Sequence, residues 1–375
     1  MTYMVKSLHR IILFFILLFA SVNVLYAQAY QLSNQAKVSV ITCGSGDQLY
    51  SIFGHTGLRI TDPAHNLDIV YNYGTFDFST PNFYGKFVKG DLDYYVSASS
   101  FQQFLYEYQS DNRDVFEQEL RLSPAQKQQL LEALNKNLFT DERSYRYKFI
   151  DKNCTTMVMD KVNEVLVGTK ITKNKPYESS YRAVINPYLE TLYYEKLGIN
   201  IIFGHRPDAE AIQLFLPSEL MASLAQLKVE GKPLVTTTTT HFLQDKSLLK
   251  TVWWNTSYTL LFGLLLLVFS NNRYVYLTYC TLAGLLGLFL IGVGLYSSHR
   301  EVLWNYNALL FNPLYLPLVV FFWRKKTVPF KKVWQASILL LLVYTLYLAF
   351  QDHFTILLPF LAMHAVVLYR LKRWL

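Results

Sequence analysis

YSIFGHTGLRITD (residues 50–62) and YKFIDKNCTTMVMDKV (residues 147–162) are the two stretches that decide the fold of the N-terminal part of this chain. After its FGH turn, the first stretch alternates polar and apolar residues, which predicts a strand that begins near His55. The second carries apolar residues at helical spacing, which predicts a helix with Cys154 at or near its N-terminus. Strands and helices mixed in this way indicate an α+β domain.

Further strands and a second helix accompany these two stretches. The helix covers 123–139, because Ser123 is a suitable cap, a proline follows it and leucines recur at helical spacing. The helix after the second stretch has Asp151 or Asn153 as its cap and Gly168 at its end. Short β-branched or aromatic runs bounded by Gly, Asp and Asn predict strands at 38–42, 56–61, 68–73, 93–99, 115–122 and 145–150.

The N-terminal segment has the features of a secretory signal. Lys6 and Arg10 precede an apolar run, and an Ala-Gln-Ala sequence ends it, which predicts cleavage near Ala27 or Ala29. The alternative is an uncleaved anchor helix. In both cases residues 30–250 are exported.

The rest of the chain divides by composition. Residues 1–29 are the signal peptide or anchor, 30–235 the exported domain, 236–250 a linker with a run of threonines, and 251–375 a helical membrane domain. Each apolar stretch in the last part is close to the ~20 residues that a bilayer needs. The five predicted spans are 252–270, 274–296, 305–323, 333–350 and 354–370.

The distribution of lysines and arginines between the loops predicts which ends of these spans face the cytoplasm. With the exported domain outside, the outer loops of the membrane domain carry Arg300 alone, which follows the positive-inside rule. The inner segments carry Arg273, Arg324, Lys325, Lys326, Lys331, Lys332, Arg370, Lys372 and Arg373. We therefore predict a multi-pass protein of the bacterial inner membrane, with its N-terminal domain in the periplasm and its C-terminus in the cytoplasm. Because these loops account for most of the net charge of +8, no nucleic-acid partner is expected.

Cys154 and His55 are the candidate catalytic pair. A thiol at a helix N-terminus is more easily ionised, since the free N–H groups and the macrodipole favour an anion. An imidazole beside it can act as the base. Asn72, on the next predicted strand, is the candidate that orients the imidazole, and Asp68 is its rival.

Structural roles compete with this interpretation. Cys154 could be a small buried residue, or it could form a disulfide with Cys43 in an oxidising compartment. His55 could serve packing alone. No CxxC or HxxxH spacing occurs, so no metal is expected. Cys280 is expected to pack within a span, and His205 to lie in a loop.

Three linked motifs give the sequence a family resemblance. CGSGDQLYSIFGHTGLRITD, YNYGTFDFSTPNFYGKFVKGDLDYYV and YRYKFIDKNCTTMVMDKV occur in this order within residues 36–225. Together they resemble the periplasmic domain of the Lnb family of bacterial lipoprotein N-acyltransferases. The order of His and then Asn-Cys is also similar to the circularly permuted, NlpC-like branch of papain-like folds, to which lecithin:retinol acyltransferase-type enzymes belong.

The resemblance implies a ping-pong acyl transfer with Cys154 as nucleophile and His55 as base. The donor would be a membrane phospholipid, the intermediate a thioester, and the acceptor the α-amino group of the diacylglyceryl-cysteine of a lipoprotein. No cofactor is implied. The polar outer loop at 299–307 could contact a lipid headgroup or the lipoprotein amine, or could simply be solvated.

Two other functions remain open. A papain-like amidase or peptidase acting on cell-wall peptide would use the same Cys154 and His55, although it has little use for five spans. A membrane assembly module without enzymatic activity would instead hold Cys154 in a disulfide.

Overall fold

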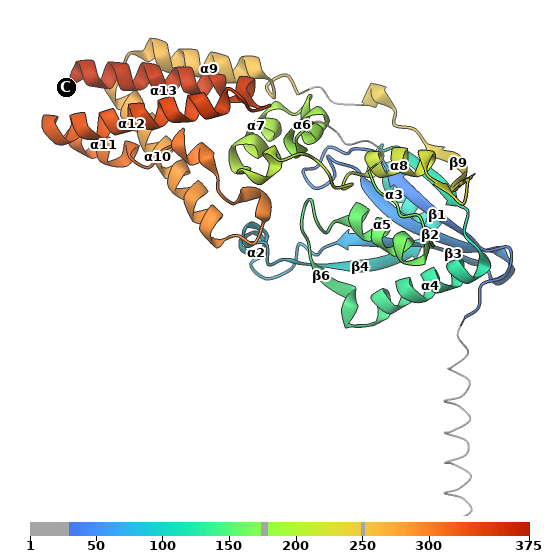
Figure 1. Ribbon diagram of the computed structural model, residues 1–375. Helices are drawn as coiled ribbons and strands as arrows, with labels where there is room; N and C mark the ends of the chain where they lie inside the picture. The colour runs from blue at the N-terminus through green and yellow to red at the C-terminus, as the bar shows by residue number, and fades with distance from the viewer. Residues whose placement is uncertain (1–29, 174–178, 249–251) are drawn as a thin grey trace, which may run out of the picture.

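The fold consists of an N-terminal sheet domain and a C-terminal helical region (Figure 1). The computed structural model describes residues 30–173, 179–248 and 252–375, and the predicted signal segment at 1–29 lies outside them. This arrangement confirms the prediction of a mixed α+β domain followed by helices.

The sheet has seven strands, all antiparallel, in the order β6-β4-β3-β2-β1-β5-β9. Its strands are β1 (Lys37–Cys43), β2 (His55–Asp62), β3 (Leu67–Thr75), β4 (Asp93–Ser100), β5 (Val115–Leu120), β6 (Ser144–Arg146) and β9 (Val235–Phe242). A separate two-stranded ribbon pairs β7 (Lys228–Val229) with β8 (Lys232–Pro233).

Helices cover both faces of the sheet. On one face, Val38, Leu58 and Tyr71 pack against α4 (Pro124–Phe139), α5 (Cys154–Val165) and α8 (Pro217–Gln226). On the other face, Ile41 and Val70 pack against α3 (Phe101–Ser110). Side chains alternate between the faces along each strand. This alternation is why the sequence predicted β1 to β5 at the correct places.

Two predictions about strands and linkers are wrong. We expected a strand at 145–150, but the strand found there, β6, ends at Arg146, because the chain then turns toward α5. The linker expected at 236–250 is a strand over its first part, since Val235–Phe242 pairs with β5 along the edge of the sheet. β-branched threonines suit an extended backbone, and here their carbonyl and N–H groups complete the ladder.

Helix caps follow the sequence closely. Ser123 caps α4 in a reciprocal capping box with Gln126. Asn153 caps α5, since its side chain accepts from the amide of Thr156 at 2.9 Å. Each cap contributes about 0.5–2 kcal/mol. The end of α5 differs, because the helix stops at Val165 and Gly168 lies in the turn that follows, with φ at +75°.

Several short helices were not predicted. The first, α2 (Phe83–Lys89), lies between β3 and β4 in the chain and reaches the end of the helical region (Figure 1). Two more, α6 (Tyr181–Ile185) and α7 (Tyr193–Ile202), lie beside the same region, whereas the unpredicted α3 and α8 pack on the sheet. Together α2, α6 and α7 form the junction between the two parts of the molecule.

The C-terminal region contains α9 (Ser257–Ser270), α10 (Arg273–Tyr296), α11 (Tyr315–Trp323), α12 (Thr327–Leu348) and α13 (Phe354–Trp374). Among the described residues, α10 and α13 are the two helices that are long and apolar enough to cross a membrane by length and composition. The predicted span at 305–323 is not one continuous helix. Its first part forms 3₁₀ turns, because Asn305 and Asn307 bind the C-terminal carbonyls of α7 and Pro313 has no N–H to donate.

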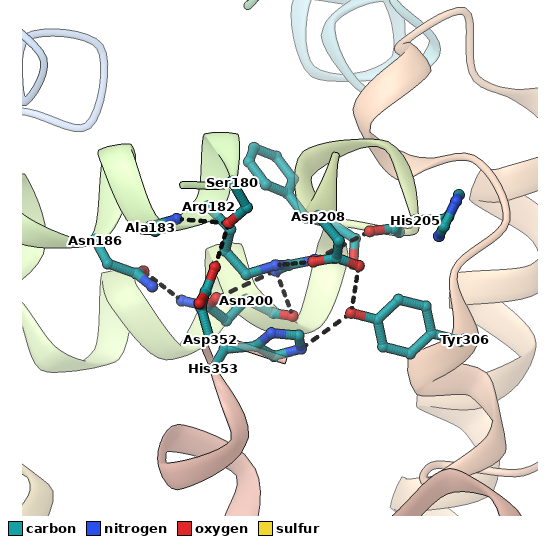
Figure 2. Close-up of polar contacts among 12 residues, drawn as sticks. Ser180, Arg182, Ala183, Asn186, Asn200, His205, Asp208, Tyr306, Asp352 and His353 are labelled. Atoms are coloured by element: carbon teal, nitrogen blue, oxygen red, sulfur yellow. Dashed lines mark hydrogen bonds and ion pairs between the residues drawn. The ribbon is translucent and has the colours of Figure 1, made fainter. Parts of the chain in front are cut away.

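A buried arginine binds several segments of the chain at this junction (Figure 2). Arg182, which is 1 % exposed, pairs with Asp208 at 2.7 Å and donates to the Asn200 side chain and to the carbonyls of Asn200, Phe203 and Gly204. Tyr306 also donates to Asp208, at 2.7 Å, and lies 3.2 Å from a ring nitrogen of His353. The N-terminal domain is therefore joined to the helical region by buried polar contacts.

Candidate active site

His55 stands at the start of β2, where the FGH turn meets the sheet. Gly54 has φ at +82°, and a Cβ at this position would lie 2.5 Å from the carbonyl oxygen of Cys43. Only glycine allows this approach, so Gly54 fixes the turn. The pairing of β1 with β2 then sets His55 opposite Cys43.

Asn72 lies beside the His55 ring. Its Oδ1 is 3.3 Å from Nε2 of His55, so the N–H of Nε2 is placed to donate to the amide oxygen. The rival residue, Asp68, is turned to Arg59, with which it forms a two-pronged ion pair at 2.8 and 2.9 Å. This geometry favours Asn72 as the residue that orients the imidazole, and it leaves Nδ1 of His55 for the thiol.

Cys154 is the first residue of α5 and is partly buried. The preceding Asn153 is buried and also donates to the carbonyls of Phe149 and Phe215, both at 2.8 Å, so the helix start is fixed from two sides. Opposite the cysteine, β3 bulges at Gly74, whose φ is +90°. A Cβ on Gly74 would lie 3.7 Å from the Cβ of Cys154. Bulges of this kind often occur beside active sites.

The surroundings of Cys154 favour its thiolate. Burial would raise the pKa of the thiol, but the charge of His55, a hydrogen bond from His55 and one from the Thr56 backbone outweigh it. The Thr155 hydroxyl, 4.0 Å from the sulfur, acts in the same direction. The pKa of Cys154 is therefore lower than that of an ordinary thiol, which makes it the better nucleophile near neutral pH.

Backbone amides near the sulfur can hold an oxyanion. Thr56 presents its backbone group to the thiol, and its hydroxyl lies 3.1 Å from that of Thr155 in a buried pair. The N-terminus of α5 adds the positive end of its dipole and the N–H groups of its first turn that the Asn153 cap does not use. The arrangement can thus stabilise the tetrahedral intermediate that a thiolate forms with an acyl carbonyl.

Three tyrosines surround this pair, and the sequence did not indicate them. Tyr108 on α3 stacks on the His55 ring, with centroids 6.2 Å apart and planes 14° apart. Tyr145 and Tyr147 lie near Cys154, and burial raises the pKa of both well above the usual range, with a smaller contribution from the Cys154 charge. They are therefore neutral donors at physiological pH. No local pattern marks them, because the contacts join residues far apart in the chain.

The other cysteines differ from Cys154. Cys43 and Cys154 are both free thiols in the structure, so the disulfide that the sequence left open finds no support there. Burial raises the pKa of Cys43 far above the ordinary range, which keeps that thiol protonated. Cys280 is buried in α10, and His205 lies in the loop before a 3₁₀ turn, as expected. Within the described part of the chain, no group of three His, Cys, Asp or Glu side chains is placed to hold a metal ion.

The polar loop at residues 299–307 contacts the N-terminal domain. Glu301 is 1 % exposed and accepts from the Ile150 amide and from Arg206, both at 3.4 Å. Arg206 also pairs with Asp151, and its hydrogen bond is the main reason that the pKa of Asp151 is lowered. The loop therefore supports the segment just before Cys154, a role that the sequence did not predict.

The fold and the site together define a two-part protein, with a sheet domain that carries a thiol beside a histidine and a helical region in which, among the described residues, two helices are long and apolar enough to cross a membrane. The family model of the Lnb N-terminal periplasmic domain matches residues 25–186, and that of the Lnb transmembrane domain matches residues 256–373. The chain belongs to the Lnb family, as its motifs predicted. No curated protein and no solved structure gives a significant match.

Proposed function

We propose that this protein is a lipoprotein N-acyltransferase that carries the acyl chain as a thioester on Cys154. The observation that supports this most is a partly buried thiol of lowered pKa beside His55, in a periplasmic domain joined to a membrane domain. Family membership suggests an acyltransferase. A nucleophile at the membrane suits a substrate that resides in the bilayer.

In the first half-reaction, His55 takes the proton of the Cys154 thiol, and the thiolate attacks the carbonyl carbon of a phospholipid ester. The Thr56 amide and the N-terminus of α5 hold the oxyanion. When the tetrahedral intermediate collapses, the C–O bond breaks and the glycerol oxygen takes the proton from His55. A lysophospholipid leaves, and the acyl chain stays on sulfur.

In the second half-reaction, the α-amino group of a diacylglyceryl-cysteine attacks the thioester carbonyl. His55 accepts a proton from the attacking nitrogen and returns it to the departing sulfur, so the C–S bond is exchanged for an amide bond. Asn72 holds the imidazole with Nδ1 toward the sulfur throughout. No cofactor takes part in this scheme.

We further propose the arrangement in which this chemistry occurs. Strand β2 with His55 precedes helix α5 with Cys154, the order of the permuted papain-like folds. The exported domain extends through β9 to Phe242 rather than ending at 235, because β9 belongs to its sheet. Helices α9 to α13 form the multi-pass part in the bacterial inner membrane, with the C-terminus in the cytoplasm.

The test is acyl transfer in a membrane depleted of its own lipoprotein N-acyltransferase. Wild type and Cys154→Ala are expressed there, and mass spectrometry determines whether a reporter lipoprotein carries two or three acyl chains. We expect three chains with wild type and two with Cys154→Ala. Cys280→Ala is the matched control, since it removes a buried thiol far from His55 and should leave three chains.

A hydroxylamine-sensitive acyl group on Cys154 would confirm the thioester directly. A reporter that stays diacylated with abundant, folded wild type would overturn the proposal. In that case the release of peptides from cell-wall fragments would identify the alternative, a papain-like amidase with the same Cys154 and His55.

A further inference from the structure

An exposed apolar surface lies on the periplasmic domain where it meets the helical region. We call it the aromatic face, and it consists of Leu49, Tyr50, Phe78, Tyr84 and Phe87, all of them exposed. It belongs to the loop before β2, the segment after β3 and helix α2. So many large apolar side chains gathered on one surface indicate a binding surface rather than chance exposure.

The rings of this face are in contact with one another. Phe78 lies 6.2 Å from Tyr50 and 5.0 Å from Phe83, and Phe83 stacks on Phe87 at 6.4 Å, with planes 5° apart. Beneath them Phe76 contacts Phe78 at 4.9 Å. The face is therefore a continuous aromatic surface rather than a set of separate side chains.

The face is continuous with the membrane domain. Residues just after the end of α10 bind the last carbonyls of α2: Ser297 Oγ donates to Val88, the Ser298 amide to Lys89 and His299 Nε2 to Phe87, at 2.6–2.7 Å. Since α10 ends at Tyr296, α2 lies beside that end of the helix (Figure 1). In a membrane-spanning α10, this end is where the helix leaves the bilayer. Aromatic side chains favour that level.

Cations lie beside the rings. Lys86 and Lys89 project from α2 into a cavity of about 680 Å³, which Arg146 and Tyr296 also line together with Asp91 and Asp93. Lys89 pairs with Asp91 and lies 5.5 Å from the centroid of the Tyr296 ring, and Arg146 pairs with Asp93 at 3.3 Å. The three cations and two carboxylates of this lining leave a net charge of +1, and a basic excess next to an apolar surface suits the phosphates and acyl chains of a lipid interface.

The rings also lead toward the candidate nucleophile. Phe76 contacts Tyr94 at 5.3 Å, and Tyr94 stacks on Tyr147 at 4.6 Å. Tyr147 in turn lies near Cys154, whose charge affects its pKa after the larger effect of burial. The aromatic side chains therefore form an unbroken row of contacts from the exposed face to the neighbourhood of the thiol.

We propose that the aromatic face is an interfacial docking surface that rests in the headgroup region of the outer leaflet and presents phospholipid to the site. Its occupant is the phospholipid bilayer that α10 crosses. The second half of this inference rests on the proposed function, whereas the docking itself does not.

The test measures the depth of a nitroxide label in the full-length protein, reconstituted in vesicles of phosphatidylethanolamine and phosphatidylglycerol. In a Cys154→Ala background, Tyr84→Cys and Tyr106→Cys each receive one label, because Cys43 and Cys280 are buried. Both tyrosines are exposed, at 78 % and 69 %, but Tyr106 lies on α3, farther from the helical region (Figure 1). Power saturation with oxygen and with a water-soluble nickel chelate then reports the surroundings of each label.

We expect the label at position 84 to collide more with oxygen and less with nickel than the label at 106. Equal access to nickel at the two positions would overturn the docking. Protection from nickel without a gain in oxygen collisions would also overturn it, because protein rather than lipid would then cover the face.

A second measurement separates docking from catalysis. Combined Phe78→Ser and Tyr84→Ser should slow thioester formation from bilayer phospholipid several-fold while leaving alkylation of Cys154 by iodoacetamide unchanged. If the label is in lipid but wild type forms no thioester, the docking stands and the proposed function fails. If thioester formation is normal in the double variant, the face does not present the substrate.

Discussion

Two polar clusters, one around Arg182 and one around Cys154, differ in how completely their groups are hydrogen-bonded. Arg182 is buried, and each of its guanidinium nitrogens has a partner at 2.7–3.3 Å. At the reactive groups around Cys154 the contacts are fewer, one of 3.3 Å between His55 and Asn72 and one of 4.0 Å between the sulfur and Thr155, which is long even for sulfur. The thiol is also only partly buried.

The difference indicates what each cluster does. A buried charge with all its donors used holds segments together and has nothing left for a ligand. A thiol and an imidazole with loose contacts retain the capacity to bind a substrate and move a proton, and catalytic hydrogen bonds commonly tighten only when substrate binds. Disrupting the first cluster should therefore cost stability, and disrupting the second should cost activity.

The largest effect is expected at His55. His55→Gln should lower acyl transfer by about 10²–10⁴-fold, the usual contribution of a general base. It should also raise the pKa of Cys154, because after the opposing effect of burial the imidazole makes the largest contributions that lower it. Rates of iodoacetamide alkylation measured against pH should show the thiolate forming at higher pH than in wild type.

The control for this variant is His241→Gln. His241 also lies on a strand of the same sheet and pairs with Glu117 at 2.6 Å, away from the thiol. Its replacement should leave the alkylation profile where it is. If the pH profile of alkylation is unchanged in His55→Gln, His55 is not the base that activates Cys154.

The next effect is expected at Arg182 and concerns stability. Arg182→Met leaves Asp208 buried without its cation, with Tyr306 as its remaining partner, and should destabilise the fold by about 3–5 kcal/mol. Thermal unfolding of the purified protein measures this as a lower melting temperature. Lys37→Met removes an exposed pair with Glu119 and should cost about 0–1 kcal/mol. Equal melting temperatures for the two variants would contradict the comparison.

The two clusters were not equally predictable from the sequence. Gly54, His55 and Cys154 stand in local patterns, since the turn, the alternating strand and the capped helix are each encoded within a few neighbouring residues. Arg182 lies in a five-residue helix, and its partners come from distant parts of the chain. Burial of such a residue depends on tertiary packing, which no local pattern records.

The same contrast explains the elements that the sequence analysis missed. Helix α2 has seven residues, which is too short to show a helical period, and its N-cap, Asn82, is in the left-handed region. Strand β9 consists largely of threonines, so it lacks the alternation that marked β1 to β5. Both elements are held by contacts with distant segments, α2 by the end of α10 and β9 by β5.

The smallest effect distinguishes Asn72 from Asp68. Asn72→Ala should lower acyl transfer about 3–10-fold, because one hydrogen bond to the imidazole contributes about 0.5–1.5 kcal/mol. Asn72→Asp keeps an acceptor for Nε2 and should retain more activity than Asn72→Ala. Asp68→Ala should leave the rate unchanged, because its partner Arg59 also pairs with Glu117 and lies over the Phe101 ring.

Kinetic constants and the alkylation profile together distinguish an orienting role of Asn72 from a purely structural one. If Asn72 acts only by orienting the imidazole, its loss should affect kcat more than KM, and the alkylation profile of Cys154 should move slightly toward higher pH. A purely structural role for Asn72 would lower the melting temperature without moving that profile. The opposite pattern, a slow Asp68→Ala and a normal Asn72→Ala, would assign the orienting role to the carboxylate and require Arg59 to release it when substrate binds.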